Sequence, residues 1–177
     1  MILRTKIAFT VTILLLIILS SCIKVETFPP EPVIKFKEFK VYPNSDSAAV
    51  VLSFQDGDGD IGLDIEDTLS PYNSDSYFYY NAYLEYYELM NGVWVKGTAD
   101  PNGNNFPTAD TIVFKNRLPN ITPIGQNKAL KGDVILTLEP FYYNPVSNHS
   151  DSIKYKVVII DRALNISNII ETGVITH

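Results

Sequence analysis

Aspartates supply the clearest chemistry in this sequence. Five of them fall within a twelve-residue segment, in which glycines separate the first three: Asp56, Asp58, Asp60, Asp64 and Asp67. Like charges packed this densely repel one another unless a cation lies among them. Ca²⁺ binds about 6–8 oxygen ligands in irregular geometry, and glycines let the backbone turn its carbonyls toward the ion. The segment therefore predicts a Ca²⁺ site in which these five carboxylates are ligands.

The acidic segment does not match the EF-hand loop, which would place a helix on each side of the ion. Ile61 stands where that loop needs glycine, and Asp67 stands where it needs a bidentate glutamate. The flanking residues are typical of strands, so we expect a calcium loop of the Asp-x-Asp-x-Asp type on a β-sheet protein. The alternative is a solvated turn in which aspartate and glycine serve only as turn formers.

A second segment, residues 161–168, offers further ligands. In an immunoglobulin topology the loop after the second strand and the loop before the last strand lie at the same end of the sandwich. Asp161 or Asn165 could then reach the metal. Two considerations oppose this. Strict up-and-down alternation of eight strands would put the two loops at opposite ends, and both side chains can instead bond the backbone of their own turn.

Residue types needed for most catalysis are scarce. The two histidines are His149 and the last residue, and the single cysteine, Cys22, cannot form an internal disulfide. Carboxylates clustered on one loop are poorly placed to flank a glycosidic bond from opposite sides. The net charge of −6 opposes binding to a phosphate backbone, which needs clustered lysine and arginine. We therefore expect no enzyme and no nucleic-acid partner.

Tyrosines crowd into residues 77–87, where seven of eleven residues are aromatic. If this segment is a strand, one of its faces carries four of them: Tyr77, Tyr79, Tyr83 and Tyr87. Stacked phenols on an exposed face suit sugar rings or a protein partner. The alternative is that these rings pack in the core and pair across strands.

The N-terminal 21 residues have the layout of a signal peptide. Arg4 and Lys6 precede an apolar run, residues 7–19, which is shorter than the roughly 18–20 residues that a membrane-spanning helix needs. The run ends in Leu-Ser-Ser-Cys, which resembles the lipobox of bacterial lipoproteins. The resemblance implies cleavage before Cys22 and its acylation, giving a lipid anchor of the palmitate type. An ordinary secretory signal with a chance cysteine is the alternative.

Residues 22–32 then form a tether. Pro29, Pro30 and Pro32 fix the backbone and predict an extended, stiff segment. At ~3.1 Å per residue this segment spans about 30 Å. A lipid at Cys22 would attach the following domain to the membrane at that distance.

Strands must position these residues, because no long run has apolar residues at helical spacing. Eight segments are rich in valine, isoleucine, tyrosine and phenylalanine: residues 33–40, 48–54, 77–90, 93–96, 111–117, 133–139, 152–160 and 168–175. Asn91-Gly92 lies between two of them and predicts a hairpin. Residues 33–177 are therefore expected to form an all-β, immunoglobulin-like antiparallel β-sandwich of seven or eight strands. A jelly roll or an open barrel is the alternative.

The whole pattern resembles small outer-membrane lipoproteins of the Bacteroidetes. The shared stretches are Phe-x-Asp-Gly-Asp-Gly-Asp-Ile-Gly-Leu at residues 54–63, Asp-Arg-Ala-x-Asn-x-Ser-Asn at residues 161–168, and residues 118–132. The resemblance implies an outer-membrane lipoprotein with an immunoglobulin-like domain, on either face of that membrane, and implies no activity. It also implies O-glycosylation at Asp-Ser/Thr-aliphatic triplets, which this sequence has at Ser47, Thr68, Thr111 and Ser152.

Together these observations predict a lipid-anchored binding or scaffolding module outside the cytoplasm, stabilised by Ca²⁺. An outer-membrane protein complex is one expected partner. The alternative is a glycan-binding accessory lipoprotein that uses the tyrosine-rich segment.

Overall fold

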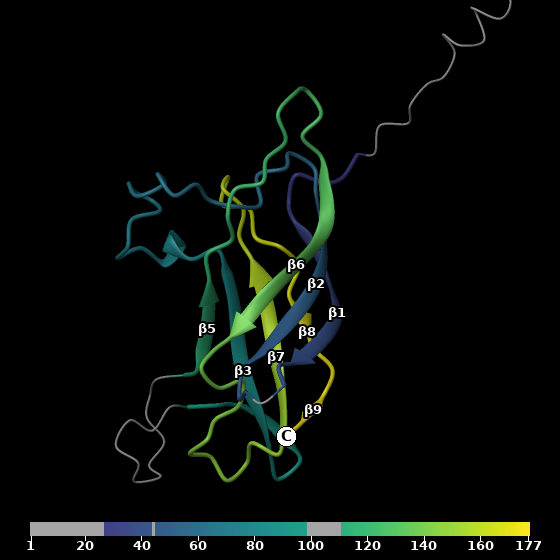
Figure 1. Cartoon of the computed structure of the whole chain (residues 1–177), viewed down its shortest axis with the longest axis vertical. Coiled ribbons are helices and arrows are strands. Elements are labelled where there is room, and N and C mark those ends of the chain that lie inside the picture. Colours follow the sequence, from purple (N-terminus) through teal and green to yellow (C-terminus); the bar gives the residue numbers. More distant parts are fainter. Residues whose placement is uncertain (1–26, 44, 99–110) are drawn as a thin grey trace, which may run out of the picture.

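The structure is a computed structural model that describes residues 27–43, 45–98 and 111–177 (Figure 1). The signal peptide, Cys22 and the start of the tether lie outside the described residues. Within the described ranges the chain forms strands and one 3-10 turn, and no α-helix is found. No helix in these ranges is long and apolar enough to cross a membrane.

Three long strands form the first sheet: β1 (Val33–Val41), β2 (Ala48–Asp56) and β6 (Leu130–Leu138). Their order is β1-β2-β6, and both pairings are antiparallel. A register shift in β1 between Phe36 and Glu38 marks a β-bulge. The central strand of this sheet, β2, ends at Asp56 and so leads directly into the acidic segment.

The second sheet is built on β3 (Ala82–Met90) and β7 (Ser152–Ile159), which pair with each other. Two strands, β4 (Val93–Lys96) and β5 (Val113–Asn116), pair with successive parts of β3. Two short strands, β8 (Ile170–Glu171) and β9 (Ile175–Thr176), pair with successive parts of β7. All of these pairings are antiparallel, and the predicted β-sandwich is confirmed.

The connectivity is the immunoglobulin-like one. The chain passes from the first sheet to the second after β2, returns for β6, and crosses again for β7. Because β4 and β5 both run antiparallel to β3, they point the same way and act together as one edge strand. Strict alternation is thereby broken, and the β2–β3 and β7–β8 loops meet at one end of the molecule (Figure 1).

The structure departs most from the expected strand boundaries in two places. Residues 77–79 form a 3-10 turn, η1 (Tyr77–Tyr79), and β3 begins only at Ala82. The cause is local: the Ser76 side chain caps the turn by accepting the Phe78 N–H. The last predicted strand is also interrupted, because the chain pairs with β7 at residues 170–171 and again at 175–176.

The core lies between the two sheets. Strand β7 shows how the sequence builds it, because buried and less buried residues alternate along its whole length. Its core-facing side chains are fully buried: Ile153, Tyr155, Val157 and Ile159. They pack against the inward side chains of the opposite sheet, among them Leu52 and Leu136. Alternation of this kind is the feature that sequence reasoning detects best.

Two asparagines join the sheets at their edges. The Asn168 side chain, just before β8, accepts the Ile34 N–H at 2.8 Å and donates to the Ile34 C=O at 2.9 Å. At the opposite seam the Asn116 side chain of β5 bonds the N–H and C=O of Thr137, each at 3.3 Å. Each side-chain amide thus bonds the N–H and C=O of one edge-strand residue in the other sheet, as a neighbouring strand would do.

Candidate metal centre

Three carboxylates converge at the end of β2. Asp56, Asp58 and Asp60 each present an oxygen, and these three oxygens lie within 4.8 Å of one another. Asp56 is fully buried, and its Oδ1 accepts the Gly59 N–H at 3.2 Å. Asp56 Oδ2 and Asp60 Oδ1 are also buried, yet neither has a hydrogen-bond partner. Buried carboxylate oxygens without donors are rare, because each loses its water without compensation.

The electrostatics of the cluster are those of acids without a counter-charge. Burial, together with the neighbouring Asp58, raises the pKa of Asp56 to about 7. Burial likewise raises the pKa of Asp60 to about 6, with the charges of Asp161 and Asp58 adding to the effect. A cation placed among these oxygens would reverse both shifts, because it favours the ionised forms.

Glycines let this loop pass through a crowded space. A Cβ on Gly57 would overlap the carbonyl oxygen of Phe28, and the Gly57 N–H donates to the Pro29 C=O at 2.8 Å. Gly59 has φ of +68°, and a Cβ there would overlap the carbonyl of Lys128. The end of the tether and the segment just before β6 therefore both lie against the acidic loop.

The second predicted loop does lie beside the cluster. The Arg162 N–H donates to the Asp60 C=O at 2.9 Å, and the neighbouring Asp161 is 1% exposed. Its carboxylate accepts the Asn165 N–H at 2.7 Å and the Asn165 side-chain amide at 2.8 Å. Asp161 thus approaches the acids of the cluster, and Asn165 holds it within its own turn, as the alternative expectation had it. A role of either residue as a metal ligand stays a prediction.

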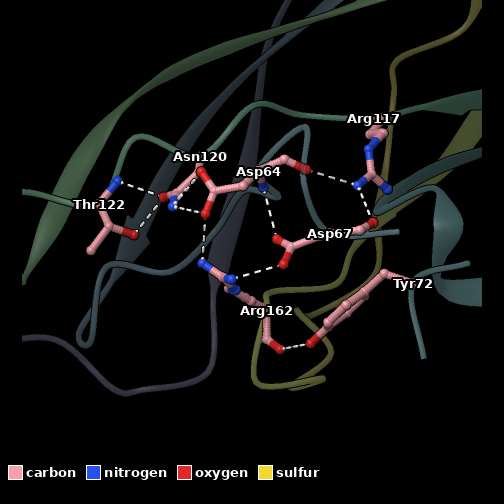
Figure 2. A network of polar contacts seen from close by, with 7 residues as sticks. All are labelled: Asp64, Asp67, Tyr72, Arg117, Asn120, Thr122 and Arg162. Carbon is pink, nitrogen blue, oxygen red and sulfur yellow. Dashed lines mark hydrogen bonds and ion pairs between the residues drawn. The ribbon is translucent and has the colours of Figure 1, made fainter. Parts of the chain in front are cut away.

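Asp64 and Asp67 are not brought into the cluster. Arg162 Nη1 lies 2.8 Å from an oxygen of Asp64, and its Nη2 lies 2.8 Å from an oxygen of Asp67 (Figure 2). Asp64 also accepts the Asn120 amide at 3.0 Å and 3.1 Å. The sequence reasoning assigned five carboxylates to a metal, but the structure supplies these two with an arginine as their counter-charge.

A second arginine fixes the backbone of the same loop. Arg117 Nη2 donates to the carbonyls of Asp64 and Asp67, at 3.0 Å and 2.9 Å (Figure 2). Its Nη1 donates to the Tyr79 carbonyl. The Tyr72 hydroxyl donates to the Arg162 carbonyl and so joins the β2–β3 loop to the β7–β8 loop. Sequence reasoning missed Arg117, Asn120 and Tyr72, because no local pattern marks side chains whose partners lie far along the chain.

The four predicted tyrosines do not share one face. Tyr83 and Tyr87 do lie on the outer face of β3, but they are only 5% and 9% exposed. Tyr77, in η1, stacks on Tyr83 with ring centroids 4.6 Å apart and is 60% exposed. Tyr79 turns toward Arg117, whose guanidinium lies 4.8 Å from the ring centroid. The exposed aromatic surface is therefore centred on Tyr77.

The predicted modification sites have different surroundings. Thr68 and Thr111 are exposed, whereas Ser47 and Ser152 are half-buried. Ser152 begins β7, and the aspartate before Thr111 lies outside the described residues. O-glycosylation at these four residues stays a prediction, as does acylation of Cys22.

Comparison of the chain with models of protein families, with curated proteins and with solved structures finds no match. The resemblance to Bacteroidetes lipoproteins therefore stays an expectation from the sequence. Function has to be inferred from the geometry of the site.

Proposed function

We propose that this chain is a lipid-anchored binding module of the cell envelope, whose sandwich is stabilised by Ca²⁺ held between Asp56, Asp58 and Asp60. The observation that carries the metal assignment is the pair of buried carboxylate oxygens, Asp56 Oδ2 and Asp60 Oδ1, that have no hydrogen-bond partner. A cation is the simplest group that satisfies both at once, since the third carboxylate lies within the same 4.8 Å.

Oxygen-only ligands favour Ca²⁺ over transition metals, which prefer nitrogen and sulfur. The loop is irregular, and its glycines let backbone carbonyls complete the coordination, as Ca²⁺ tolerates. Mg²⁺ suits the cluster less, because it requires a tight octahedron and retains its waters. Asp161, which follows β7 and whose charge acts on Asp60, is a further candidate ligand for the ion.

A stabilising role suits the location of the cluster better than catalysis. The cluster joins the end of β2 to the tether through Gly57 and to the β7–β8 loop through the Asp60 carbonyl. A bound ion would therefore hold three segments that are distant in sequence. We accordingly propose no enzymatic activity for this chain.

The proposed anchor agrees with the direction of the tether. The Pro29 carbonyl accepts the Gly57 N–H at 2.8 Å, so the tether meets the domain at the metal end. Acylation of Cys22 would place this end toward the outer membrane, on its periplasmic or its outer face. The proposed partners are a protein of that membrane or a glycan.

Thermal melting in excess EDTA and in millimolar Ca²⁺ tests the metal assignment. At a Ca²⁺ concentration of 100 Kd, the free energy of unfolding should rise by about 2.7 kcal/mol, which raises Tm by about 5–10 °C for a domain of this size. Asp58→Ala should abolish the response, because the exposed Asp58 completes the three-carboxylate group. The control Glu66→Gln removes an exposed charge from the same loop and should respond as the wild type does. Equal wild-type Tm in both buffers would refute the assignment.

A further inference from the structure

A groove with a volume of about 620 Å³ lies on the outer face of the second sheet. Its floor is formed by side chains of β3, β5 and β7, which include Tyr83, Lys115 and Val158. One wall is the segment 74–77 of the β2–β3 loop, and the other includes Ile166 and Ile169 of the β7–β8 loop. The volume is within the ~300–1,000 Å³ typical of small-ligand clefts.

The groove offers an aromatic surface that is already held in place. The Tyr77 and Tyr83 rings are parallel to within 1°, with centroids 4.6 Å apart. The Tyr83 hydroxyl donates to the Tyr77 carbonyl, so the stacked pair is fixed through both ring and backbone. Although Tyr83 covers one face of its ring, Tyr77 is 60% exposed. An apolar ligand surface can therefore lie against Tyr77 without any rearrangement of the floor.

The charges lining the groove cancel. Two carboxylates, Asp75 and Glu85, face two ammonium groups, Lys115 and Lys156. Glu85 is already bonded by Lys96 at 2.6 Å, and Lys156 pairs with Glu171 at 3.2 Å. A strongly charged ligand would gain little here, since either sign meets repulsion as well as attraction. The lining favours a neutral ligand that carries many donors and acceptors and also has apolar faces.

Backbone pairing disfavours an extended peptide as the ligand. A peptide that adds to a sheet takes its affinity from main-chain hydrogen bonds at a free edge. The floor of this groove is the face of the sheet, where β3 and β7 already pair with each other from Ala82 to Glu88. A ligand in the groove must therefore be recognised by side chains.

We infer that this groove binds a neutral carbohydrate chain, with the exposed Tyr77 ring stacking on the C–H face of a sugar and the polar side chains of the groove bonding its hydroxyls. The inference deepens the proposed function and rests on it, because it names the ligand class of the binding module. It also changes the expected ligand face, since Tyr79 and Tyr87 lie outside the groove and Tyr80 lines it.

The two walls of the groove are held by the contacts around Arg162. The Tyr72 hydroxyl bonds the Arg162 carbonyl, just before the wall at residues 74–77. Residues 161–165 lead directly into the other wall at Ile166. Because the walls are fixed before a ligand arrives, less conformational entropy is lost on binding. The Arg162 contacts therefore support the binding site by holding its walls in place, although no ligand would touch Arg162 itself.

Titration calorimetry with short neutral oligosaccharides tests the inference, with uronic-acid oligosaccharides and an uncharged peptide as comparison ligands. The expected result is binding of a neutral oligosaccharide alone. Tyr77→Ala removes the ring face on which the sugar stacks and should weaken binding by about three- to tenfold, whereas Tyr77→Phe should retain it. Tyr42→Ala removes another exposed tyrosine, outside the groove, and should change nothing.

Three results would overturn the inference: no neutral oligosaccharide binds at millimolar concentration, a charged oligosaccharide or the peptide binds instead, or Tyr77→Ala leaves affinity unchanged. Lys115→Ala gives a second variant, in case Tyr77→Ala melts below the wild type, and should also weaken binding. Failure of sugar binding with an intact Ca²⁺ response would refute the ligand class alone. Sugar binding without any Ca²⁺ response would refute the metal assignment and leave the groove standing.

Discussion

Replacing Asn81 by alanine should destabilise this protein more than any change at a surface asparagine. Asn81 is 2% exposed and precedes β3. Its Oδ1 accepts the Leu118 N–H at 2.6 Å, and its Nδ2 donates to the Ile61 carbonyl at 3.2 Å and to the Leu118 carbonyl at 3.5 Å. The side chain thus ties the residue after the acidic cluster to the segment that follows β5.

The magnitude follows from the groups that lose their partners. The Leu118 carbonyl keeps the Leu63 N–H as a donor, at 2.9 Å. The Leu118 N–H and the Ile61 carbonyl each lose the partner that Asn81 supplied, and both residues are under 10% exposed. An unsatisfied buried group costs about 1–3 kcal/mol, so Asn81→Ala should lower the free energy of unfolding by roughly 4 kcal/mol.

Urea unfolding followed by tyrosine and tryptophan fluorescence measures this change, and a Tm lowered by about 10 °C should accompany it. Asn127→Ala is the matched control, because Asn127 is exposed and its side chain accepts one long bond within the described ranges, from the Ala129 N–H at 3.3 Å. That control should stay within about 0.5 kcal/mol of the wild type. An Asn81→Ala protein that unfolds within 1 kcal/mol of the wild type, on the scale of a single neutral hydrogen bond, would show that water replaces these bonds and that our account of the loop is mistaken.

Three further predictions concern the loop charges and the anchor. Arg162→Met should lower the free energy of unfolding by about 1–2 kcal/mol, because two partly exposed ion pairs are lost; an unchanged urea midpoint would contradict this. In EDTA, the free energy of unfolding should fall as pH rises from about 4 to about 7, because the folded-state pKa values of Asp56 and Asp60, about 7 and about 6, lie above the 3.8 of an ordinary aspartate. The folded protein then keeps protons that the unfolded chain has lost. Melting curves across this pH range check the prediction, and a flat profile would contradict it. Cys22→Ala should release the protein from membranes or leave the signal peptide uncleaved, and unchanged fractionation and mass would exclude the proposed anchor.

Period-two alternation of apolar residues made the sandwich predictable from the sequence. It located the strands well, since one face of each strand must be buried whatever the rest of the chain does. The type of fold followed from the absence of helical spacing. The way β4 and β5 share one edge of β3 did not follow, because pairing between distant segments leaves no local mark. Counting eight strictly alternating strands therefore suggested, wrongly, that the β2–β3 and β7–β8 loops lie at opposite ends of the sandwich.

The candidate metal site was predictable only where the interacting residues are close together in the sequence. Asp56, Asp58 and Asp60 converge because glycines curl the backbone over five residues, which the spacing already showed. Asp64 and Asp67 look equivalent in sequence, but their counter-charge comes from Arg162, about a hundred residues away. Local charge density shows that a cation is needed and cannot tell a metal ion from an arginine.

The 3-10 turn at Tyr77 is a second feature that the composition of its segment did not predict. Seven aromatic residues in eleven read as a continuous strand, because aromatic side chains favour sheets. The Ser76 cap outweighs that preference over residues 77–79 and lifts Tyr77 out of the sheet and over Tyr83. The exposed ring on which the proposed carbohydrate site depends is thus produced by one serine.

The asparagine bridges at the seams bear on how copies of this domain behave when crowded together on a membrane. The outer strands of a sandwich present unpaired N–H and C=O groups, and these can recruit a strand from another molecule and start aggregation. Asn168 occupies both groups of Ile34 on the outer side of β1, and Asn116 occupies both groups of Thr137 on the outer side of β6. The bulge between Phe36 and Glu38 distorts β1 further along the same edge. At each edge of the three-stranded sheet an amide of the same chain thus occupies both backbone groups of one residue, which would hinder the formation of intermolecular sheets when the domain is displayed at high surface density.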